Sequence, residues 1–319
     1  MKIDKILIIG ANGQVGSALL PKLRSIYGEE QVIASDLALP SKPLSYFEQV
    51  DATDKQSLAN LVKKHDITQI YHLAAILSAK GEADPIWAWN VNMQSLLNVL
   101  GIGREFKLHK IFVPSSIAVF GSNVPADLTP QDVVLNPSTI YGVSKVATEN
   151  MLNYYAGRYG LDVRSLRYPG IISYQSLPGG GTTDYAVEIF HTAISGRRFN
   201  CYLAEHTTLP MIYIDDAIRA TIELMEAPID QVKVRTSYNL SGLSFTPGEL
   251  FKQLQQYYPD FECDFVPDFR QYIADSWPNS IDDEDAKNDW GWKVEFDLAR
   301  MTSEMIAHLS DLELLNITN

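Results

Sequence analysis

The sequence has few of the residues that build metal centres, disulfides or membrane spans. It contains two cysteines, Cys201 and Cys263, which form neither a CxxC pair nor a zinc-ligand cluster. A disulfide between them stays possible, but no pattern supports one, so we expect a reducing, cytoplasmic location. No apolar run approaches the roughly 20 residues that span a bilayer, and the first residues enter a strand without a signal-peptide cleavage region. We therefore expect no bound metal and no membrane association.

Positive charge is scarce in the last quarter of the chain. Residues 237–319 hold 16 acidic and 5 basic residues, which accounts for −11 of the net charge of −13. Such a surface repels a phosphate backbone, so we expect no nucleic-acid partner. A solvated acidic face explains most of these residues equally well. The length of 319 residues allows one large α/β domain or two smaller ones.

A glycine-rich turn stands between a predicted strand and a predicted helix near the N-terminus. The apolar run 5–9 is typical of a strand that is buried on both faces, and the helical pattern starts after Gly16. Glycines here permit a tight turn and let backbone N–H groups approach a pyrophosphate. The spacing G-x-x-G-x-x-G differs from the commoner G-x-G-x-x-G, and a glycine turn without ligand is the alternative. From this turn we predict cofactor contacts by Gly10, Asn12, Gly13, Gln14, Val15 and Gly16.

An acidic residue follows the glycine turn at the distance that selects a cofactor. The strand predicted over 31–36 ends at Asp36, 20 residues after Gly16. A carboxylate there accepts hydrogen bonds from the ribose hydroxyls and repels a 2′-phosphate, which favours NAD over NADP. A further strand is predicted over 69–75, with small residues at its end. The next cofactor contacts are predicted at Asp51, Ala52, Leu73, Ala74 and Ala75.

A tyrosine and a lysine stand four residues apart at the start of a long predicted helix, Tyr141-Gly-Val-Ser-Lys145. Positions four apart share a helix face. Lowering a phenol pKa from about 10 to about 7 requires roughly 4 kcal/mol, and an ammonium about 4 Å away supplies that at an effective dielectric constant of about 20. The pair can therefore provide a general base, although a surface Tyr and Lys one turn apart is the alternative. Ser116 ends a predicted strand at the same crevice, and we expect it to hydrogen-bond beside the phenolate.

Alternating strands and helices predict an α/β fold, a Rossmann-like doubly wound parallel sheet with a smaller C-terminal α/β substrate lobe. We expect residues 1–170 to form the NAD-binding domain, with segments around 196–237 returning to it. Residues 171–195 and 238–319 would form the lobe. A flexible glycine loop and a helix start with free N–H groups and hydroxyls suit a carboxylate, or merely cap the helix. Substrate contacts are predicted at Ser78, Ser116, Tyr141, Gly180, Thr182, Thr183, Asp184 and Trp277.

Together these motifs resemble the extended short-chain dehydrogenase/reductase family, and residues 211–217 are similar to a segment of its sugar-epimerase branch. The resemblance implies a catalytic trio of Ser116, Tyr141 and Lys145. It also implies cofactor contacts by Tyr141, Lys145, Tyr168 and Asn90. Asn90 matches the asparagine of the family's Asn-Val-x-Gly-Thr element, although Met-Gln-Ser follows here in place of Gly-Thr.

The stretches 167–173, 178–186, 276–280 and 282–292 resemble a branch of this family that oxidises the 3-hydroxyl of L-threonine with NAD and without zinc. The implied product is 2-amino-3-oxobutanoate, and the resembling enzymes pair as homodimers. A nucleotide-sugar epimerase or dehydratase of the same family is the alternative function, but it needs basic residues for a diphosphate in the acidic C-terminal quarter. A non-catalytic NAD sensor is a second alternative, and it would not need the Tyr–Lys pair.

Overall fold

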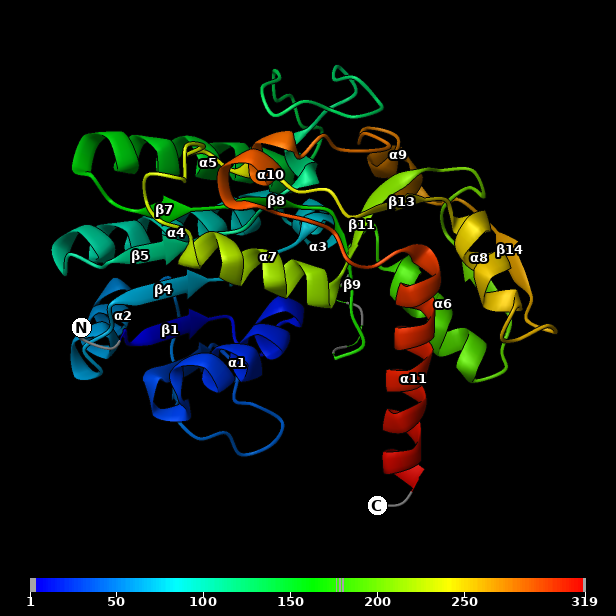
Figure 1. Ribbon diagram of the computed structural model, residues 1–319, viewed down its shortest axis with the longest axis horizontal. Helices are drawn as coiled ribbons and strands as arrows, with labels where there is room; N and C mark the ends of the chain where they lie inside the picture. Colours follow the sequence, from blue (N-terminus) through cyan, green and yellow to red (C-terminus); the bar gives the residue numbers. More distant parts are fainter. Residues whose placement is uncertain (1–3, 176, 178, 180, 318–319) are drawn as a thin grey trace.

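A parallel sheet of six strands forms the centre of the molecule (Figure 1). The computed structural model describes residues 4–175, 177, 179 and 181–317, with side chains up to residue 311. The strand order is β3-β2-β1-β4-β5-β7. Their bounds are Phe47–Gln49, Val32–Asp36, Ile6–Ile9, Gln69–His72, Lys110–Phe112 and Val163–Arg164. Strands β1 and β4 are buried at every position, as strands covered on both faces should be.

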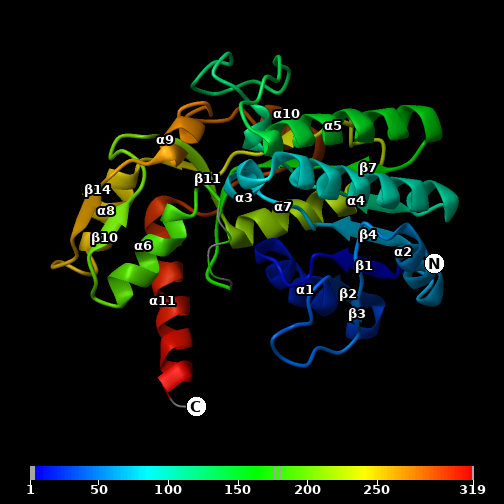
Figure 2. The same cartoon turned by 180° about the vertical axis from the view of Figure 1, so that it is seen from behind.

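Helices cover both faces of this sheet. One face carries α2 (Lys55–Lys64), α4 (Pro85–Glu105) and α5 (Ile140–Tyr159), and the other carries α1 (Gln14–Tyr27) and α7 (Ile214–Glu226), as Figures 1 and 2 show from opposite sides. Side chains fix the helix starts. Asp54 accepts hydrogen bonds from two amides of α2, and Thr139 accepts one from Gly142 in α5. The strand order reverses direction between β1 and β4, where doubly wound sheets bind ligands. The predicted fold class is confirmed.

The predicted strand that ends at Ser116 is divided in the structure. It runs as β5 to Phe112 and resumes as β6 (Ser115–Ser116), and the neighbouring strand is likewise divided, into β7 and β8 (Leu166–Tyr168). Pro114 has no N–H and cannot continue the ladder of β5. Beyond it the pairing changes: β6 pairs with β8, which also pairs with β12 (Tyr238–Asn239). This change aligns Ser116 with Tyr168 at the edge of the crevice.

The C-terminal part adds small sheets and helices beside one end of the main sheet (Figure 1). One sheet has the order β13-β11-β9 and another pairs β10 with β14. The strands are β9 (Gly170–Ile172), β10 (Phe199–Cys201), β11 (Leu209–Tyr213), β13 (Leu243–Phe245) and β14 (Cys263–Phe265). The helices are α6 (Tyr185–Ile194), α8 (Pro247–Gln255), α9 (Phe269–Ala274), α10 (Glu284–Trp290) and α11 (Leu298–Ile317). Strand β10, which follows α6, pairs in parallel with the later strand β14.

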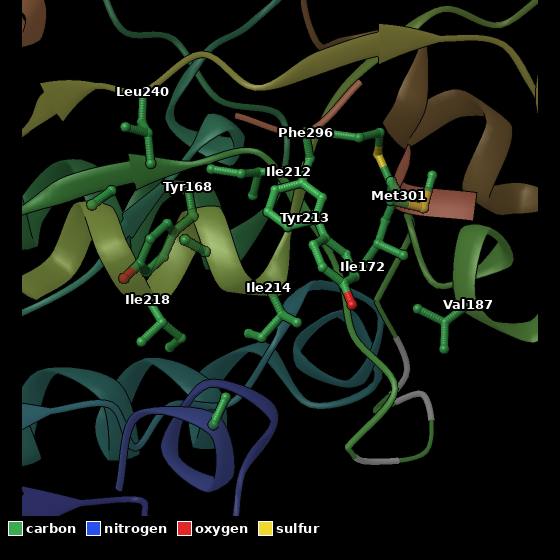
Figure 3. Close-up of a cluster of buried hydrophobic side chains, with 14 of the residues drawn as sticks. Tyr168, Ile172, Val187, Ile212, Tyr213, Ile214, Ile218, Leu240, Phe296 and Met301 are labelled. Carbon is green, nitrogen blue, oxygen red and sulfur yellow. The ribbon is translucent and has the colours of Figure 1, made fainter. Parts of the chain in front are cut away.

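A shared hydrophobic core joins the two parts. In Figure 3, Tyr168 of β8 and Ile218 of α7 lie in one cluster with Tyr213 of β11 and Met301 of α11. The ring of Tyr213 lies 4.6 Å from that of Phe296, centroid to centroid. Each side chain buried in this way contributes roughly 1.5–3 kcal/mol to folding. The core therefore holds the C-terminal segments in a fixed position against the sheet that carries the glycine turn. In the described part of the chain, no helix is long and apolar enough to cross a membrane.

Candidate active site

One pocket collects most of the predicted site residues. It lies between the glycine turn, the ends of β4 and β6, the start of α5 and the segment before α6. Predicted residues that line it are Gly10, Gly13, Gln14, Val15, Gly16, Leu73, Ala75, Ser78, Ser116, Tyr141, Lys145, Tyr168, Thr182, Thr183, Asp184 and Trp277. Predicted residues outside its lining are Asn12, Asp36, Asp51, Ala52, Ala74 and Asn90. Gly180 lies outside the described residues.

The glycine turn is shaped by backbone contacts that leave no room for side chains. Gly10 has a φ of +89°, and a Cβ there would lie 2.7 Å from the amide nitrogen of Ala74. A Cβ on Gly16 would lie 2.2 Å from the carbonyl oxygen of Gly10. Gly13 begins α1 and no side chain caps this helix start, so the first amides of α1 are available to an anion. The donors present in the turn therefore fit a pyrophosphate.

Asp36 stands next to this turn at the end of β2. One carboxylate oxygen accepts a hydrogen bond of 3.0 Å from the amide of Asn12, and the other accepts one of 3.2 Å from Ala38. The carboxylate is thereby fixed beside the glycine turn, where a ribose would follow the pyrophosphate. Asp51 is exposed and holds both the amide and the hydroxyl of Thr53, and the carbonyl of Ala52 accepts from Asn98 of α4.

Tyr141 and Lys145 of α5 face Ser116 of β6 across the pocket. Tyr141 makes a side-chain hydrogen bond with Ser116. The Nζ of Lys145 lies 5.5 Å from the centre of the Tyr141 ring and donates a hydrogen bond of 2.6 Å to the carbonyl of Pro114. The three predicted catalytic residues thus lie within one small volume. The ammonium is directed to a backbone carbonyl and to the ring face.

The electrostatics of this pair differ from the sequence-based prediction. Burial raises the pKa of Tyr141 to about 12, and the hydrogen bond with Ser116 opposes that rise. Burial lowers the pKa of Lys145 to about 8, and Glu149 opposes that fall. In the protein without cofactor, burial of Tyr141 therefore outweighs the effect expected from a nearby ammonium. The cause is desolvation, which disfavours a charged phenolate in a buried position.

Asn90 and Asn92 of α4 lie in different surroundings. Asn90 is exposed and lies outside the pocket lining. Asn92 instead accepts a hydrogen bond of 2.8 Å from the amide of Ile76 and donates one of 3.1 Å to its carbonyl. This holds the segment after β4 that carries Ser78 into the pocket. Residues two apart lie on opposite sides of a helix, so Asn90 and Asn92 cannot both face the sheet. Asn92 shares its helix face with the buried Leu96 and Val99. This spacing could have identified Asn92 as the asparagine that points inward.

The C-terminal side of the pocket is built from side chains. Thr182 is buried with 1% exposure, and its Oγ1 has no hydrogen-bond partner among the described residues. One oxygen of Asp184 accepts a hydrogen bond of 2.8 Å from the amide of Gly181. Trp277 is half-buried and packs on a small cluster around Ile117. An orphaned hydroxyl in a pocket indicates a missing polar partner.

Sequence reasoning missed several lining residues, most of which adjoin predicted ones. A Cβ on Gly170 would lie 2.6 Å from the methyl group of Thr183, a close approach that Pro169-Gly170 after a strand could have suggested. Nothing in the sequence marks the other missed residues as part of a pocket. The missed lining residues are Leu77, Pro114, Ser115, Ile117, Pro169, Gly170, Ile171 and Gly181. Within the described residues, no three His, Cys, Asp or Glu side chains are grouped as metal ligands.

The sequence that carries these residues matches a known protein family. Residues 6–241 match the model of the NAD dependent epimerase/dehydratase family. The chain belongs to that family. The match spans the glycine turn, Ser116 and the Tyr141–Lys145 pair, and it ends within the segment that follows β12.

Three relatives resemble the chain over nearly its whole length. The mitochondrial L-threonine 3-dehydrogenase of Bos taurus is 47% identical over 310 residues, which cover 95% of this chain and 82% of that protein. A solved partial-consensus L-threonine 3-dehydrogenase is 53% identical with a TM-score of 0.95, covering 96% and 99% of the two chains. A monomeric L-threonine 3-dehydrogenase of metagenomic origin, in its apo form, is 47% identical with a TM-score of 0.94 and the same coverage.

Proposed function

We propose that this family member oxidises the 3-hydroxyl of L-threonine with NAD, giving 2-amino-3-oxobutanoate, as a step of threonine breakdown. The observation that carries the proposal is the single pocket in which the glycine turn, Ser116 and Tyr141 meet the segment before α6. The near full-length similarity to L-threonine 3-dehydrogenases supports the choice of substrate.

The residues of the cofactor side fit NAD. The uncapped start of α1 would hold the pyrophosphate, and Asp36 would accept hydrogen bonds from the ribose and reject a 2′-phosphate. When bound, NAD supplies the hydride acceptor and a positive ring near the pocket. The chain supplies orientation and proton handling.

Tyr141 is proposed to take the proton from the substrate hydroxyl, with Ser116 hydrogen-bonding the same oxygen. Because burial raises the pKa of Tyr141 to about 12, the phenolate needs more positive charge than the free protein provides. Lys145 contributes part of it, since its Nζ lies 5.5 Å from the ring centre. The proton transfer is therefore expected to depend on the cofactor being bound first.

The remaining polar groups suit an amino acid in its zwitterionic form. Asp184 is the one carboxylate among the described lining residues, and it would attract the substrate ammonium. The unpartnered hydroxyl of Thr182 and the neighbouring Thr183 would bind the carboxylate. Ser78 and Trp277 complete the enclosure from two other segments.

The alternative function, epimerisation or dehydration of a nucleotide sugar, needs cations for a diphosphate. Lys145 is the one lysine or arginine among the described lining residues, and its Nζ is already bonded to Pro114. Calorimetric titration with a UDP-sugar distinguishes the two functions. Micromolar binding would favour the alternative, and no binding would favour the amino acid.

The direct test is NAD reduction, followed by its near-ultraviolet absorbance, with L-threonine beside L-serine and L-allo-threonine. We expect L-threonine to be oxidised most efficiently, because the pocket must accommodate the methyl group and one configuration at C3. Equal rates with all three, or no reduction with any, would refute the proposal.

We further propose a cytoplasmic homodimer. Two neighbouring helices carry exposed apolar side chains that a second copy could cover: Trp87 and Leu97 on α4, and Val143 and Tyr154 on α5. Sedimentation at several protein concentrations tests this. A monomer at every concentration, as in the relative described as monomeric, would contradict it.

A further inference from the structure

Helix α5 holds the strand segment 114–116 at three successive levels. Tyr141, Lys145 and Glu149 are spaced four residues apart and share one helix face. Tyr141 bonds the side chain of Ser116, and Lys145 bonds the carbonyl of Pro114 at 2.6 Å. The third level is the carboxylate of Glu149, which accepts a hydrogen bond of 2.7 Å from the hydroxyl of Ser115. Tyr141 and Lys145 thus line the pocket, and Glu149, one turn further along the same face, lies outside its lining.

The carboxylate of Glu149 is buried and fixed from a second strand. Arg167 of β8 donates two hydrogen bonds to it, of 2.9 and 2.8 Å, and the two side chains are only 2% and 4% exposed. The same guanidinium bonds the carbonyl of Gln131 and the side chain of Asn239. Because β8 pairs with β6, this ion pair fixes the strand that carries Ser116 relative to the helix that carries Tyr141. A bidentate pair of this kind tolerates little displacement.

The charged and titratable groups that face Lys145 come from three elements. Tyr141 and Glu149 lie on α5, His72 lies on β4, and Arg167 lies on β8 behind Glu149. Burial lowers the pKa of His72 to about 3, so His72 is neutral and adds no charge. Burial also lowers the pKa of Lys145, to about 8, and Glu149 is the group that opposes this fall. The ammonium that Tyr141 needs is therefore maintained against desolvation by Glu149.

We infer that Glu149 is a positioning residue for the proton transfer at Tyr141: it keeps Lys145 charged and locks Ser116 at its distance from the phenol. This inference rests on the proposed function. Glu149 acts through its neighbours, since it does not line the pocket.

The chain contains a matched control, a second buried bidentate ion pair that lies away from the pocket. Arg164 of β7 donates to the two oxygens of Asp162 at 3.1 and 2.7 Å and is fully buried. It bonds the last carbonyls of α7, and neither partner lines the pocket. Asp162 also accepts a hydrogen bond of 2.9 Å from Arg235. Asp162→Asn therefore removes a buried carboxylate from two arginines, whereas Glu149→Gln removes one from a single arginine, and it does not touch the face of Lys145.

The experiment compares Glu149→Gln and Asp162→Asn in the full chain. The titration of the Lys145 side chain is followed by NMR with isotope-labelled lysine, assigned with Lys145→Arg, and the pH profile of kcat is recorded beside it. Glu149→Gln should move the Lys145 titration and the alkaline limb of kcat to lower pH by about one unit, since an opposite charge nearby shifts a pKa by that order. Asp162→Asn should lower Tm and leave both midpoints in place.

An unchanged Lys145 titration in folded Glu149→Gln would overturn the inference, as would equal shifts in both variants. If Glu149→Gln does not fold, Glu149→Gln/Arg167→Met removes both charges and should shift the titration in the same direction. The NMR titration needs neither substrate nor cofactor. A parent protein that fails to oxidise L-threonine would thus refute the proposed function, whereas the titration decides the role of Glu149 separately.

Discussion

The two sides of the pocket are built in different ways. On the cofactor side, backbone meets backbone: a Cβ on Gly16 would lie 2.2 Å from the carbonyl oxygen of Gly10, and the helix start offers its own amides. On the substrate side, side chains such as Ser78, Thr182 and Trp277 arrive from segments roughly a hundred residues apart. A site made of backbone tolerates almost no change and serves one ligand. A site made of side chains can change its substrate while the cofactor half stays the same.

The largest effect is expected where the two sides meet, at Tyr141. Tyr141→Phe removes the hydroxyl that we propose takes the proton and keeps the ring, so turnover should fall by roughly 10²–10⁴-fold, the usual contribution of general acid–base catalysis. NAD affinity, measured by calorimetry, should stay nearly unchanged, because we propose that the pyrophosphate binds at the start of α1. A variant that keeps a tenth of the parent turnover would remove Tyr141 from the role of base.

The second largest effect is expected at Gly16, on the cofactor side of the pocket. Gly16→Ala forces a displacement of the turn, because the new methyl group overlaps the carbonyl of Gly10. We expect a loss of about 1–3 kcal/mol of unfolding free energy or more, and at least tenfold weaker NAD binding. Gly157→Ala is the control: Gly157 is exposed within α5 and a Cβ there meets nothing within 4 Å. It should be neutral or slightly stabilising. Equal NAD binding in Gly16→Ala and Gly157→Ala would contradict the prediction, because it would show that the turn can accommodate a methyl group.

The same contrast explains what the sequence could predict. Glycine spacing, strand periodicity and the acid at Asp36 are local signals, and they sufficed to predict the parallel sheet. The division of one strand at Pro114 depends on which strand lies next to β6, and that is decided by tertiary packing. The substrate side depends on such packing throughout.

Helix α5 shows a second limit of pattern reasoning. Its apolar residues predicted the helix but not its buried face: Val143 is exposed, whereas Lys145 and Glu149 are buried. Periodicity assumes that the buried face is apolar, and here chemistry and an ion pair occupy it. The pKa of Tyr141 escaped prediction for a related reason, because the desolvation of a side chain is a property of the assembled fold.

A smaller effect is expected at Asp36, on the preference for NAD over NADP. Asp36→Asn keeps an acceptor for the amide of Asn12 and removes the negative charge that would repel a 2′-phosphate. We expect the preference for NAD over NADP, measured as the ratio of kcat/KM, to fall by roughly tenfold, about 1.4 kcal/mol. Asp51→Asn provides the control, since Asp51 is bonded to Thr53 and should not alter the ratio. A ratio that falls equally in both variants would contradict the selection by Asp36.

The smallest effect tests the substrate side. The Oγ1 of Thr182 is buried without a partner among the described residues, so the free protein carries the cost of a desolvated hydroxyl. Thr182→Val replaces it with a methyl group of the same shape. The KM for L-threonine should rise by roughly 3–10-fold, corresponding to the loss of one hydrogen bond of about 1 kcal/mol, while NAD affinity is unchanged. Without substrate, Tm should stay equal or rise slightly.

Thr221→Val is the control for Thr182→Val, and the opposite result is expected from it. Thr221 is also fully buried, but its hydroxyl is already bonded to Tyr168 and to the carbonyl of Ala217. The same substitution there should lower Tm and leave KM in place, because it orphans the Tyr168 hydroxyl inside the shared core. If Thr182→Val instead lowers Tm and spares KM, the Thr182 hydroxyl has a structural partner, and the carboxylate of the substrate must be bound by other groups.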